Sequence, residues 1–591
     1  MNNRWILGPV VKVSAANILF TVNPNDIKTK IQNGIVQAVK GVNDYVYFRI
    51  NARLIVIAKI YIVDDSSKPY IKDEPNSKFK DEYILSAYPI GEIKNGKYTA
   101  GVNNLPMVGQ NTYYAGEEIL KIIFNNETND TAGLKIGCLT NNEFITPYLS
   151  GNKILSGHIA ILGNTGSGKS TTAKVIFKQL SEDHKKLKDK TKFLIFDVHD
   201  DYKFLGDQSE GKYFNASEIG VGPKDFDIED WESLLQPSEK TQKPILDLGL
   251  KLAIIRDDEK IIKLYFLIIR NLFTNGAMSA VLRYQITDEY LRSIYNLVPK
   301  AKVCEKSNVQ EAWSKFNPQY GNTPEKDGQK NFFDNLKDLC DYQDESLREV
   351  LDEIDDNQKQ RDFSISDLAW AVDLAIRIEE SEGNNSIRAH TEGILTRLRD
   401  LETKYSENFF SPNKSIVNDI ENNESKFIIL QVSSFDDDLL KLFSTYLTRK
   451  ILTKKKEEKD RDKLAPCYLI FDEAHRYMLQ NGNINNIFDR VSREGRKFGT
   501  YLIVISQRPS ELSTVVLSQI KTYFIHRIQN NIDLRFILEN VPTITQLDVK
   551  RLPLMPIGTV LVSSENDYSY ELKVNDRGIP KTSKSILPFL N

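Results

Sequence analysis

The segment at residues 163–170 reads Gly-Asn-Thr-Gly-Ser-Gly-Lys-Ser and fits the phosphate-binding pattern G-x-x-x-x-G-K-[ST]. Its glycines let the backbone curl so that N–H groups point at phosphate oxygens, and a following helix adds its positive N-terminal end. Lys169 would reach the β- and γ-phosphates, and Ser170 would ligate Mg²⁺. We therefore expect ATP and Mg²⁺ as ligands, with the nucleotide contacted by Gly163, Asn164, Thr165, Gly166, Ser167, Gly168, Lys169, Ser170 and Thr171.

A second motif, Tyr-Leu-Ile-Phe-Asp-Glu at residues 468–473, is an apolar run that ends in two acids. A buried parallel strand that ends this way delivers carboxylates to a bound nucleotide. Asp472 would hold Mg²⁺ together with Ser170, and Glu473 would orient and deprotonate the attacking water. Many strands end in acids, so the pair takes its meaning from the phosphate-binding loop upstream.

Three more polar residues are candidates for the catalytic set. Gln507 follows the strand-like run at residues 501–506 and would contact the γ-phosphate; the alternative is an ordinary loop glutamine. Arg493 and Arg496 lie in a basic cluster before that run. Either would stabilise the charge that builds up in phosphoryl transfer, supplied by a neighbouring subunit; the alternative is a surface helix end that forms salt bridges.

The segment Asp-Val-His-Asp-Asp-Tyr at residues 197–202 follows another apolar run. In open α/β folds this end of a strand faces the nucleotide. Asp197 or Asp201 would then assist water or Mg²⁺. His199 has no second histidine or cysteine nearby in the sequence, which favours an ordinary hydrogen-bonded histidine over a metal ligand.

The elements around these motifs alternate between strands and helices. The apolar run 159–162, the helix-compatible stretch 171–180 and the run 193–196 predict a β-loop-α-β unit of a parallel sheet. Further strands are expected at 427–432, 468–471, 501–505, 523–526 and 558–562. The fold class is therefore α/β: a RecA-like P-loop ATPase core with a helical insertion, preceded by a small N-terminal β-barrel.

We expect four regions. Short β-branched and aromatic runs with frequent turn residues predict a β-barrel over residues 1–148. The ATPase core is predicted at 149–224 and 406–565, and helical periodicity predicts the insertion at 225–405. The last residues, 566–591, are expected to form a C-terminal tail.

Composition and charge narrow the class of protein. The 591 residues are 40% hydrophobic and 27% charged, which is typical of folded globular chains. A formal net charge of −3 excludes a protein that coats nucleic acid by charge alone, so any DNA contact needs locally concentrated basic residues. Four scattered cysteines predict free thiols in a reducing compartment. Without a signal peptide or an apolar stretch of roughly 18 residues, we expect a cytoplasmic protein with no membrane association.

Taken together, several segments resemble the HerA branch of the HerA/FtsK translocase superfamily. They are the stretch from His158 to Ser170, the 197–202 motif, Phe-Asp-Glu-Ala-His at 471–475, and Ser-Arg-Glu-Gly-Arg-Lys-Phe-Gly at 492–499 running into Ile-Ser-Gln-Arg-Pro-Ser at 505–510. The last segment discriminates best, because many P-loop ATPases share the first and third. The N-terminal region also resembles the small β-barrel of this family.

The resemblance implies a homohexameric ring with ATP sites between subunits, double-stranded DNA in the pore and a C-terminal brace on the neighbouring subunit. Lys169, Asp472, Glu473, Gln507 and one arginine of the 493–496 pair match the family's catalytic positions. Relatives of this family work with an effector, either a nuclease or a sirtuin-like NADase. A bacterial antiphage-defence setting is the one we expect.

Two departures from the family pattern affect the prediction. Family members often carry an arginine directly before the histidine that starts the P-loop strand, and here Gly157 stands in that place. If that arginine contacts the nucleotide in the family, one charge contact is missing here, which predicts slow or partner-dependent hydrolysis. The 197–202 motif has Asp200 and Asp201 where the family usually has Gly and Glu.

Three functions stay open at the level of sequence. The first is a motor that translocates or unwinds double-stranded DNA by ATP hydrolysis. The second is a ring scaffold that assembles and regulates an effector, with a secondary ATPase activity. The third is a conjugation or secretion ATPase, which the missing membrane segment disfavours.

Overall fold

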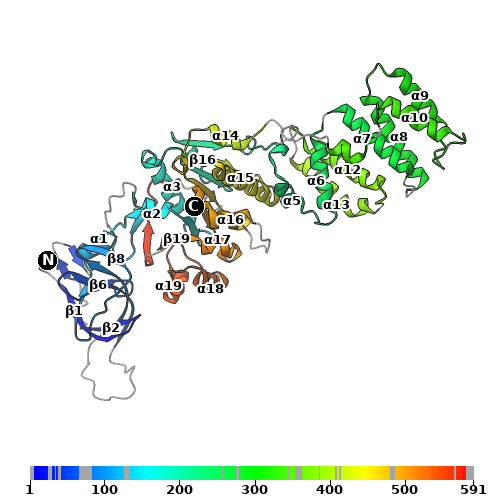
Figure 1. The fold of residues 1–591 in the computed structure, drawn as a ribbon. Helices are drawn as coiled ribbons and strands as arrows, with labels where there is room; N and C mark the ends of the chain where they lie inside the picture. The colour runs from blue at the N-terminus through cyan, green and yellow to red at the C-terminus, as the bar shows by residue number, and fades with distance from the viewer. Residues whose placement is uncertain are drawn as a thin grey trace, which may run out of the picture. The chain divides into compact units, whose positions relative to one another are not determined.

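The computed structural model describes residues 5–23, 30–32, 35–37, 41–65, 83–124, 133–255, 257–274, 278–343, 345–352, 362–384, 386–405, 409–411, 414–478, 486–564 and 568–580. The chain forms two compact units (Figure 1). One unit combines Met1–Ala216 with Asn423–Asn591, and the other is Ser217–Asn422. All four cysteines are free thiols, and Cys340 and Cys467 are buried.

The N-terminal part is a closed barrel of six strands, drawn in blue in Figure 1. Its order is β2-β1-β9-β5-β6-β7, and β7 pairs back to β2. The strands are β1 (Ile6–Val13), β2 (Ile18–Val22), β5 (Tyr45–Arg49), β6 (Leu54–Asp65), β7 (Tyr83–Lys94) and β9 (Asn111–Tyr114). Closure leaves no edge strand within the ring, and apolar side chains such as Phe20 and Phe48 fill its interior. The predicted small barrel is confirmed.

Three minor strands accompany the barrel. The strand β8 (Lys97–Ala100) pairs antiparallel with the end of β7. The strand β3 (Lys30–Gln32) pairs with β4 (Ile35–Gln37) in a separate two-stranded sheet. The helix α1 (Glu117–Phe124) follows β9 and buries Leu120, Ile123 and Phe124. These apolar residues belong to the hydrophobic core of the ATPase sheet.

The ATPase core contains a sheet of ten described strands in the order β11-β21-β20-β19-β13-β18-β17-β14-β16-β15. The seven from β19 to β15 are parallel, and β20, β21 and β11 run antiparallel to their neighbours. The strands are β11 (Gly137–Leu139), β13 (His158–Leu162), β14 (Lys192–Asp197), β15 (Gly211–Phe214), β16 (Phe427–Gln431), β17 (Cys467–Phe471), β18 (Thr500–Ser506), β19 (Ile520–Ile525), β20 (Thr559–Ser564) and β21 (Tyr570–Val574).

Continuous apolar runs build the centre of this sheet because helices cover both faces of a parallel sheet. All five residues of β13 and all five of β17 are buried. The helices of this unit include α2 (Gly151–Leu155), α3 (Lys169–Glu182), α4 (Lys203–Gly206), α15 (Asp437–Glu457), α16 (Ile487–Glu494), α17 (Thr514–Ser518), α18 (Asn531–Asn540) and α19 (Gln546–Arg551). The predicted α/β core with a P-loop is confirmed.

The sheet takes strands from beyond the expected core bounds. Gly137–Leu139 pairs with Tyr570–Val574, which also pairs with β20. The first of these strands lies in the region expected to be barrel, and the second lies in the expected tail 566–591. Backbone pairing between two segments far apart in sequence explains the difference. Residues 581–591 of the expected tail lie outside the described residues.

The second unit is helical, as predicted for the insertion (Figure 1, mainly green). Its helices are α5 (Ile228–Leu235), α6 (Gln242–Ala253), α7 (Asp258–Thr274), α8 (Ala280–Leu297), α9 (Val303–Ser314), α10 (Gly328–Leu339), α11 (Leu347–Asp352), α12 (Ile365–Ser381), α13 (Ile387–Tyr405) and α14 (Ile416–Asn422). Helix α12 packs against α6, α7 and α13. The unit extends beyond the expected 225–405 because Val221 bridges to Phe410 and Ser415.

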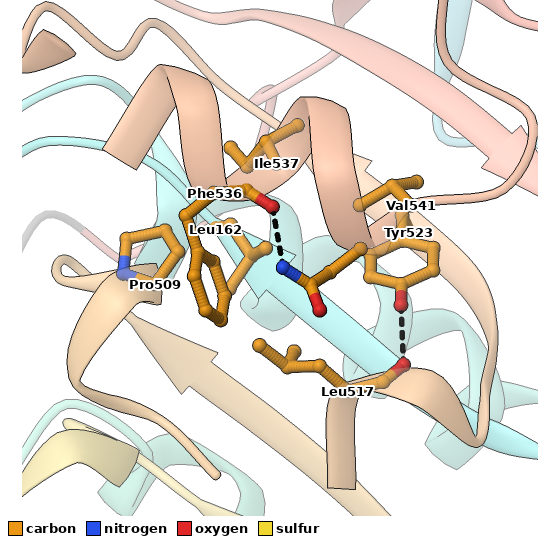
Figure 2. Close-up of a pocket in the computed structure, with 8 residues that line it drawn as sticks. Leu162, Pro509, Leu517, Tyr523, Phe536, Ile537 and Val541 are labelled. Carbon is orange, nitrogen blue, oxygen red and sulfur yellow. Dashed lines mark hydrogen bonds between the residues drawn. The ribbon is translucent and has the colours of Figure 1, made fainter. Parts of the chain in front are cut away.

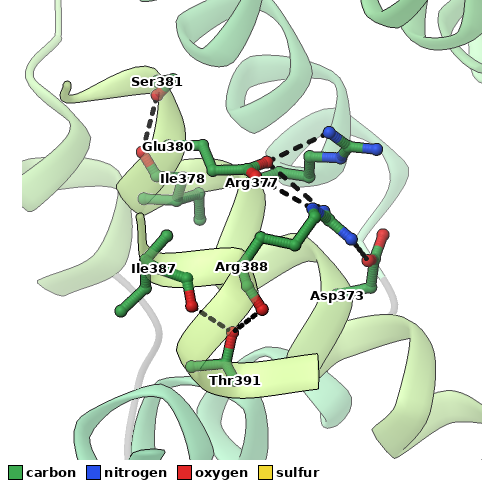
Figure 3. Close-up of polar contacts among 8 residues, drawn as sticks. All are labelled: Asp373, Arg377, Ile378, Glu380, Ser381, Ile387, Arg388 and Thr391. Atoms are coloured by element: carbon green, nitrogen blue, oxygen red, sulfur yellow. Dashed lines mark hydrogen bonds and ion pairs between the residues drawn. The ribbon is translucent and has the colours of Figure 1, made fainter. Parts of the chain in front are cut away.

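A charged network joins α12 to α13 (Figure 3). The buried Glu380 carboxylate accepts hydrogen bonds from Arg388 Nε at 2.9 Å and from Arg377 Nη1 at 3.0 Å. Arg388 Nη1 also donates to Asp373 at 3.0 Å. A buried carboxylate needs such partners, since an unpaired charge in the interior is costly.

Replacing Glu380 with alanine is expected to destabilise the helical unit by about 1–3 kcal/mol, because two half-buried arginines lose their partner. Hydrogen exchange of the full chain should then be faster at the amides of α12 and α13. The exposed Glu392 on α13 is the matched control, and Glu392→Ala should exchange like the parent chain. Equal exchange in both variants would contradict the importance of the network.

Among the described residues, no helix combines the length and the apolar character that crossing a bilayer requires.

Candidate nucleotide-binding site

The phosphate-binding loop connects β13 to α3, with β18 and β19 as the two neighbours of β13 in the sheet. Gly166 and Gly168 have φ angles of 72° and 116°, in the left-handed region that side chains disfavour. Gly168 directly precedes Lys169, the first residue of α3. The loop therefore has the curled backbone and the helix N-terminus that the sequence predicts for binding phosphate.

Lys169 lies at the centre of the candidate site. Its side chain is buried, and Nζ donates to the carbonyl of Asn164 within the loop at 3.1 Å. Burial lowers the pKa of the ammonium, and the charges of Glu473 and Asp472 oppose this change. Lys169 is therefore close enough to Asp472 and Glu473 for their charges to act on it. The phosphate-binding loop and the acidic motif after β17 lie in the same site.

Asp472 follows β17 and is almost completely buried. Burial raises the pKa of its carboxyl to about 7, and the neighbouring charges of Glu473 and Asp197 act in the same direction. Its Oδ2 is buried without a hydrogen bond to a described group. A carboxylate oxygen of this kind suits Mg²⁺, which prefers one or two carboxylates together with water and phosphate oxygens. Asp472 therefore fits its expected role.

Glu473 adopts a left-handed backbone conformation with φ 49°, and its carboxylate lies between two histidines. Oε1 lies 3.7 Å from His199 Nε2, and Oε2 lies 3.4 Å from His475 Nδ1. Burial acts to raise the pKa of Glu473, but contact with His199 and the charge of Lys169 outweigh it, so the pKa is lowered. A carboxylate that stays ionised is suited to accept a proton from water.

The contact with His199 is one that the sequence did not reveal. His199 follows β14, the strand next to β17, and its side chain is 57% exposed. Contact with Glu473 raises the pKa of the imidazole. The only available signal was that neighbouring parallel strands end at the same edge of the sheet.

Gln507 also lies beside the loop, at the end of the strand between β13 and β17. It follows β18, and its side-chain oxygen accepts a hydrogen bond from the Thr165 hydroxyl. The backbone of the loop is held by the same strand, because Gly163 N donates to Ser506 O at 3.2 Å. Gln507 is therefore close to the expected position of the phosphates.

Arg493 and Arg496 lie elsewhere in the same chain. Both are exposed, one near the end of α16 and the other in the 3₁₀ turn Gly495–Phe498. The adjacent Ser492 carbonyl accepts a hydrogen bond from Nε2 of His158, which begins β13. The phosphate-binding loop begins at the other end of β13. At the usual rise per residue of a strand, Gly163 is about 16 Å from His158. The two arginines therefore lie toward the opposite edge of the sheet from their own loop.

Asp197 and Asp201 have partners within the protein. The Asp197 carboxylate accepts from the N–H groups of Asp201 and Tyr202 at 2.9 and 3.0 Å, and burial raises its pKa to about 6. Asp201 forms an ion pair with Lys174 of α3 at 2.8 Å. These contacts favour a role in shaping the turn after β14 over the expected one of assisting water or Mg²⁺.

The space next to Gly157 is taken by a lysine. A Cβ atom at Gly157 would lie 2.3 Å from Cδ of Lys521, at the start of β19. A side chain at position 157 would therefore require Lys521 to move.

A small apolar pocket lies where α18 packs near the end of β13 (Figure 2). Leu162, Pro509, Leu517 and Ile537 are among its lining residues. Tyr523 Oη donates to the carbonyl of Leu517 at 2.5 Å, and Asn540 Nδ2 donates to that of Phe536 at 2.8 Å. With these polar groups satisfied locally, the pocket is a packing feature of α18 and is distinct from the phosphate-binding loop.

A twisted, largely parallel sheet with a phosphate-binding loop after one strand and two acids after another strand of the same sheet defines the chain as an ATP-hydrolysing P-loop enzyme. The family model described as "Helicase HerA, central domain" matches residues 134–272 and 282–451. The chain belongs to this HerA helicase family, and the resemblance seen in the sequence is confirmed.

Several known proteins are similar to this chain. A probable helicase of Methanocaldococcus jannaschii is 24% identical over 501 residues, covering 83% of this chain and 75% of the relative. The DNA double-strand break repair helicase HerA of Sulfurisphaera tokodaii is 24% identical over 465 residues, covering 77% and 71%. Among solved structures, VirB4 of Thermoanaerobacter pseudethanolicus is similar at 14% identity and a TM-score of 0.41, covering 76% of this chain and 97% of that one.

Proposed function

We propose that this chain is an ATP-driven motor that translocates or unwinds double-stranded DNA. The observation that carries the proposal is the meeting of Lys169, Asp472 and Glu473 at one edge of the sheet. The names of its relatives, which include a DNA double-strand break repair helicase, support DNA as the substrate.

The residues of the site have distinct tasks in this proposal. Lys169 and the loop N–H groups bind the β- and γ-phosphates, and Gln507 contacts the γ-phosphate beside Thr165. Glu473 accepts the proton of the attacking water. Ser170 and Asp472 would hold Mg²⁺, which would neutralise charge on the phosphate oxygens.

We extend the proposal to assembly and partners on the strength of the family resemblance. The motor works as a homohexamer with DNA in the pore, and Arg493 or Arg496 acts in the site of the next subunit. An effector, either a nuclease or a sirtuin-like NADase, works with the ring in antiphage defence. With a net charge of −3, the DNA-binding charge must be concentrated on part of the surface.

Steady-state ATP hydrolysis by the purified chain tests the proposal. We expect double-stranded DNA to raise kcat several-fold in the absence of any other protein. The variant Lys169→Ala should hydrolyse no ATP with or without DNA, because it loses the cation that contacts the transferred phosphoryl group.

Two results would contradict the motor. Hydrolysis by Lys169→Ala would overturn the site assignment. A wild-type chain that ignores DNA and hydrolyses ATP only with the effector encoded beside it would favour the alternative, a scaffold that assembles and regulates that effector.

A further inference from the structure

His526 follows β19 and is completely buried beside the phosphate-binding loop. Its backbone N–H donates to the carbonyl of Leu162, the last residue of β13, at 2.7 Å. Its Nε2 is hydrogen-bonded at 2.9 Å to Oγ1 of Thr172, in the first turn of α3, which is also completely buried. One side chain therefore connects a neighbouring strand to the helix that follows the loop.

The ring also occupies the space beside two glycines of the loop. A Cβ atom at Gly163 would lie 2.6 Å from Cβ of His526, and one at Gly168 would lie 3.3 Å from Cε1 and Nδ1. Real side chains at these positions would push the imidazole away. The glycines thus give the loop its curvature and also admit His526 beneath it.

The imidazole is neutral at physiological pH. Burial lowers the pKa of His526 to about 3, and the charge of Lys169 acts in the same direction. Hydrogen bonding with the backbone of Thr559 and of Ser167 opposes this lowering. A neutral ring can lie close to Lys169 without repelling it, whereas a cation could not.

The hydrogen bond to Thr172 points to a role beyond filling space. Burying an imidazole removes polar atoms from water, and an apolar side chain would occupy the same volume without that disadvantage. An apolar side chain would, however, lose the hydrogen bond to Thr172. That bond fixes the first turn of α3 relative to β19, and the first turn carries the N–H groups expected to meet the phosphates.

We propose that His526 is a positioning residue that holds the loop and the start of α3 in the conformation that binds ATP. It acts through Thr172 and the loop glycines. The inference rests on the proposed role of this loop as the nucleotide site and deepens it. Without the hydrogen bond between His526 and Thr172, the loop becomes ordered only when the nucleotide binds. The entropy lost in that step lowers the affinity.

Equilibrium titration of the full chain with a fluorescent ATP analogue tests the inference. Thr172→Val removes the hydroxyl at nearly constant shape, and His526→Ala removes the ring. We expect each variant to bind about tenfold more weakly, and the double variant to bind no more weakly than the weaker single variant. Thr172→Ser retains the hydroxyl and should recover most of the affinity.

The control is Thr391→Val in the helical unit. Thr391 is also a buried threonine whose hydroxyl donates a hydrogen bond, here to the carbonyl of Ile387 at 2.8 Å. The Thr391→Val variant should bind the analogue like the parent chain. Wild-type affinity in both Thr172→Val and His526→Ala, or losses that multiply in the double variant, would overturn the inference and leave the proposed function standing. A parent chain that binds no nucleotide would overturn both.

Discussion

Replacing Glu473 with glutamine is expected to lower kcat for ATP hydrolysis by about 10²- to 10⁴-fold, the range that a general base contributes. Glutamine keeps the size of the side chain and one acceptor oxygen, but its amide replaces the second oxygen with a donor and cannot accept the proton of water at neutral pH. Binding of a fluorescent ATP analogue should stay within about threefold of the parent chain, because Lys169 and the loop supply the phosphate contacts.

Glu182→Gln is the matched control for this prediction. Glu182 is the last residue of α3, its side chain is 60% exposed, and its nearest charged partner, Lys178, lies 3.9 Å away. Neutralising it should leave kcat unchanged, since exposed pairs of this kind contribute little. If Glu473→Gln and Glu182→Gln hydrolyse ATP at the same rate, Glu473 is not the base.

The strands and the loop of the site were predictable because each has a strong local signal. Residues 159–162 and 468–471 are uninterrupted apolar runs, as buried parallel strands require. Their carboxyl ends carry the loop and the two acids, and strands of one parallel sheet bring such ends to a common edge. The proximity of Lys169 to Asp472 therefore follows from the sequence once the sheet is predicted.

Contacts from isolated residues were not predictable in this way. His526 belongs to no spacing pattern, and its position beneath Gly163 and Gly168 depends on β19 lying next to β13. The position of His199 beside Glu473 depends in the same way on β14 lying next to β17. Strand order is a property of the whole fold, because sheet neighbours need not be neighbours in sequence.

The boundaries of the predicted barrel, core and tail could not be predicted from local sequence signals either. The short strand β11 contains only Gly137, Cys138 and Leu139, and its partner β21 comes more than 400 residues later, as the 435-residue separation of Cys138 and Lys573 shows. Neither segment is long enough to carry a periodic pattern. Their pairing depends on the fold as a whole, because β21 also pairs with β20 at this side of the sheet.

Replacing Arg493 and Arg496 together with alanine is expected to lower kcat by about 10³-fold or more, the effect of removing an arginine supplied in trans. Both side chains are exposed and lie toward the edge of the sheet opposite to their own loop. In the proposed ring, their charge is therefore expected to act at the site of a neighbouring copy and not at the site of the same chain.

Co-expression of two inactive variants separates action in trans from action in cis. The double arginine variant retains an intact loop, and Lys169→Ala retains both arginines, so mixed copies of the proposed ring would contain some sites with every required group. We expect such rings to regain ATP hydrolysis that neither variant shows alone. The control Arg490→Ala changes another arginine of α16, which is 53% exposed and 4.0 Å from Glu494, and this variant should hydrolyse ATP like the parent chain. Mixed rings as inactive as their parents would exclude a contribution from the neighbouring subunit.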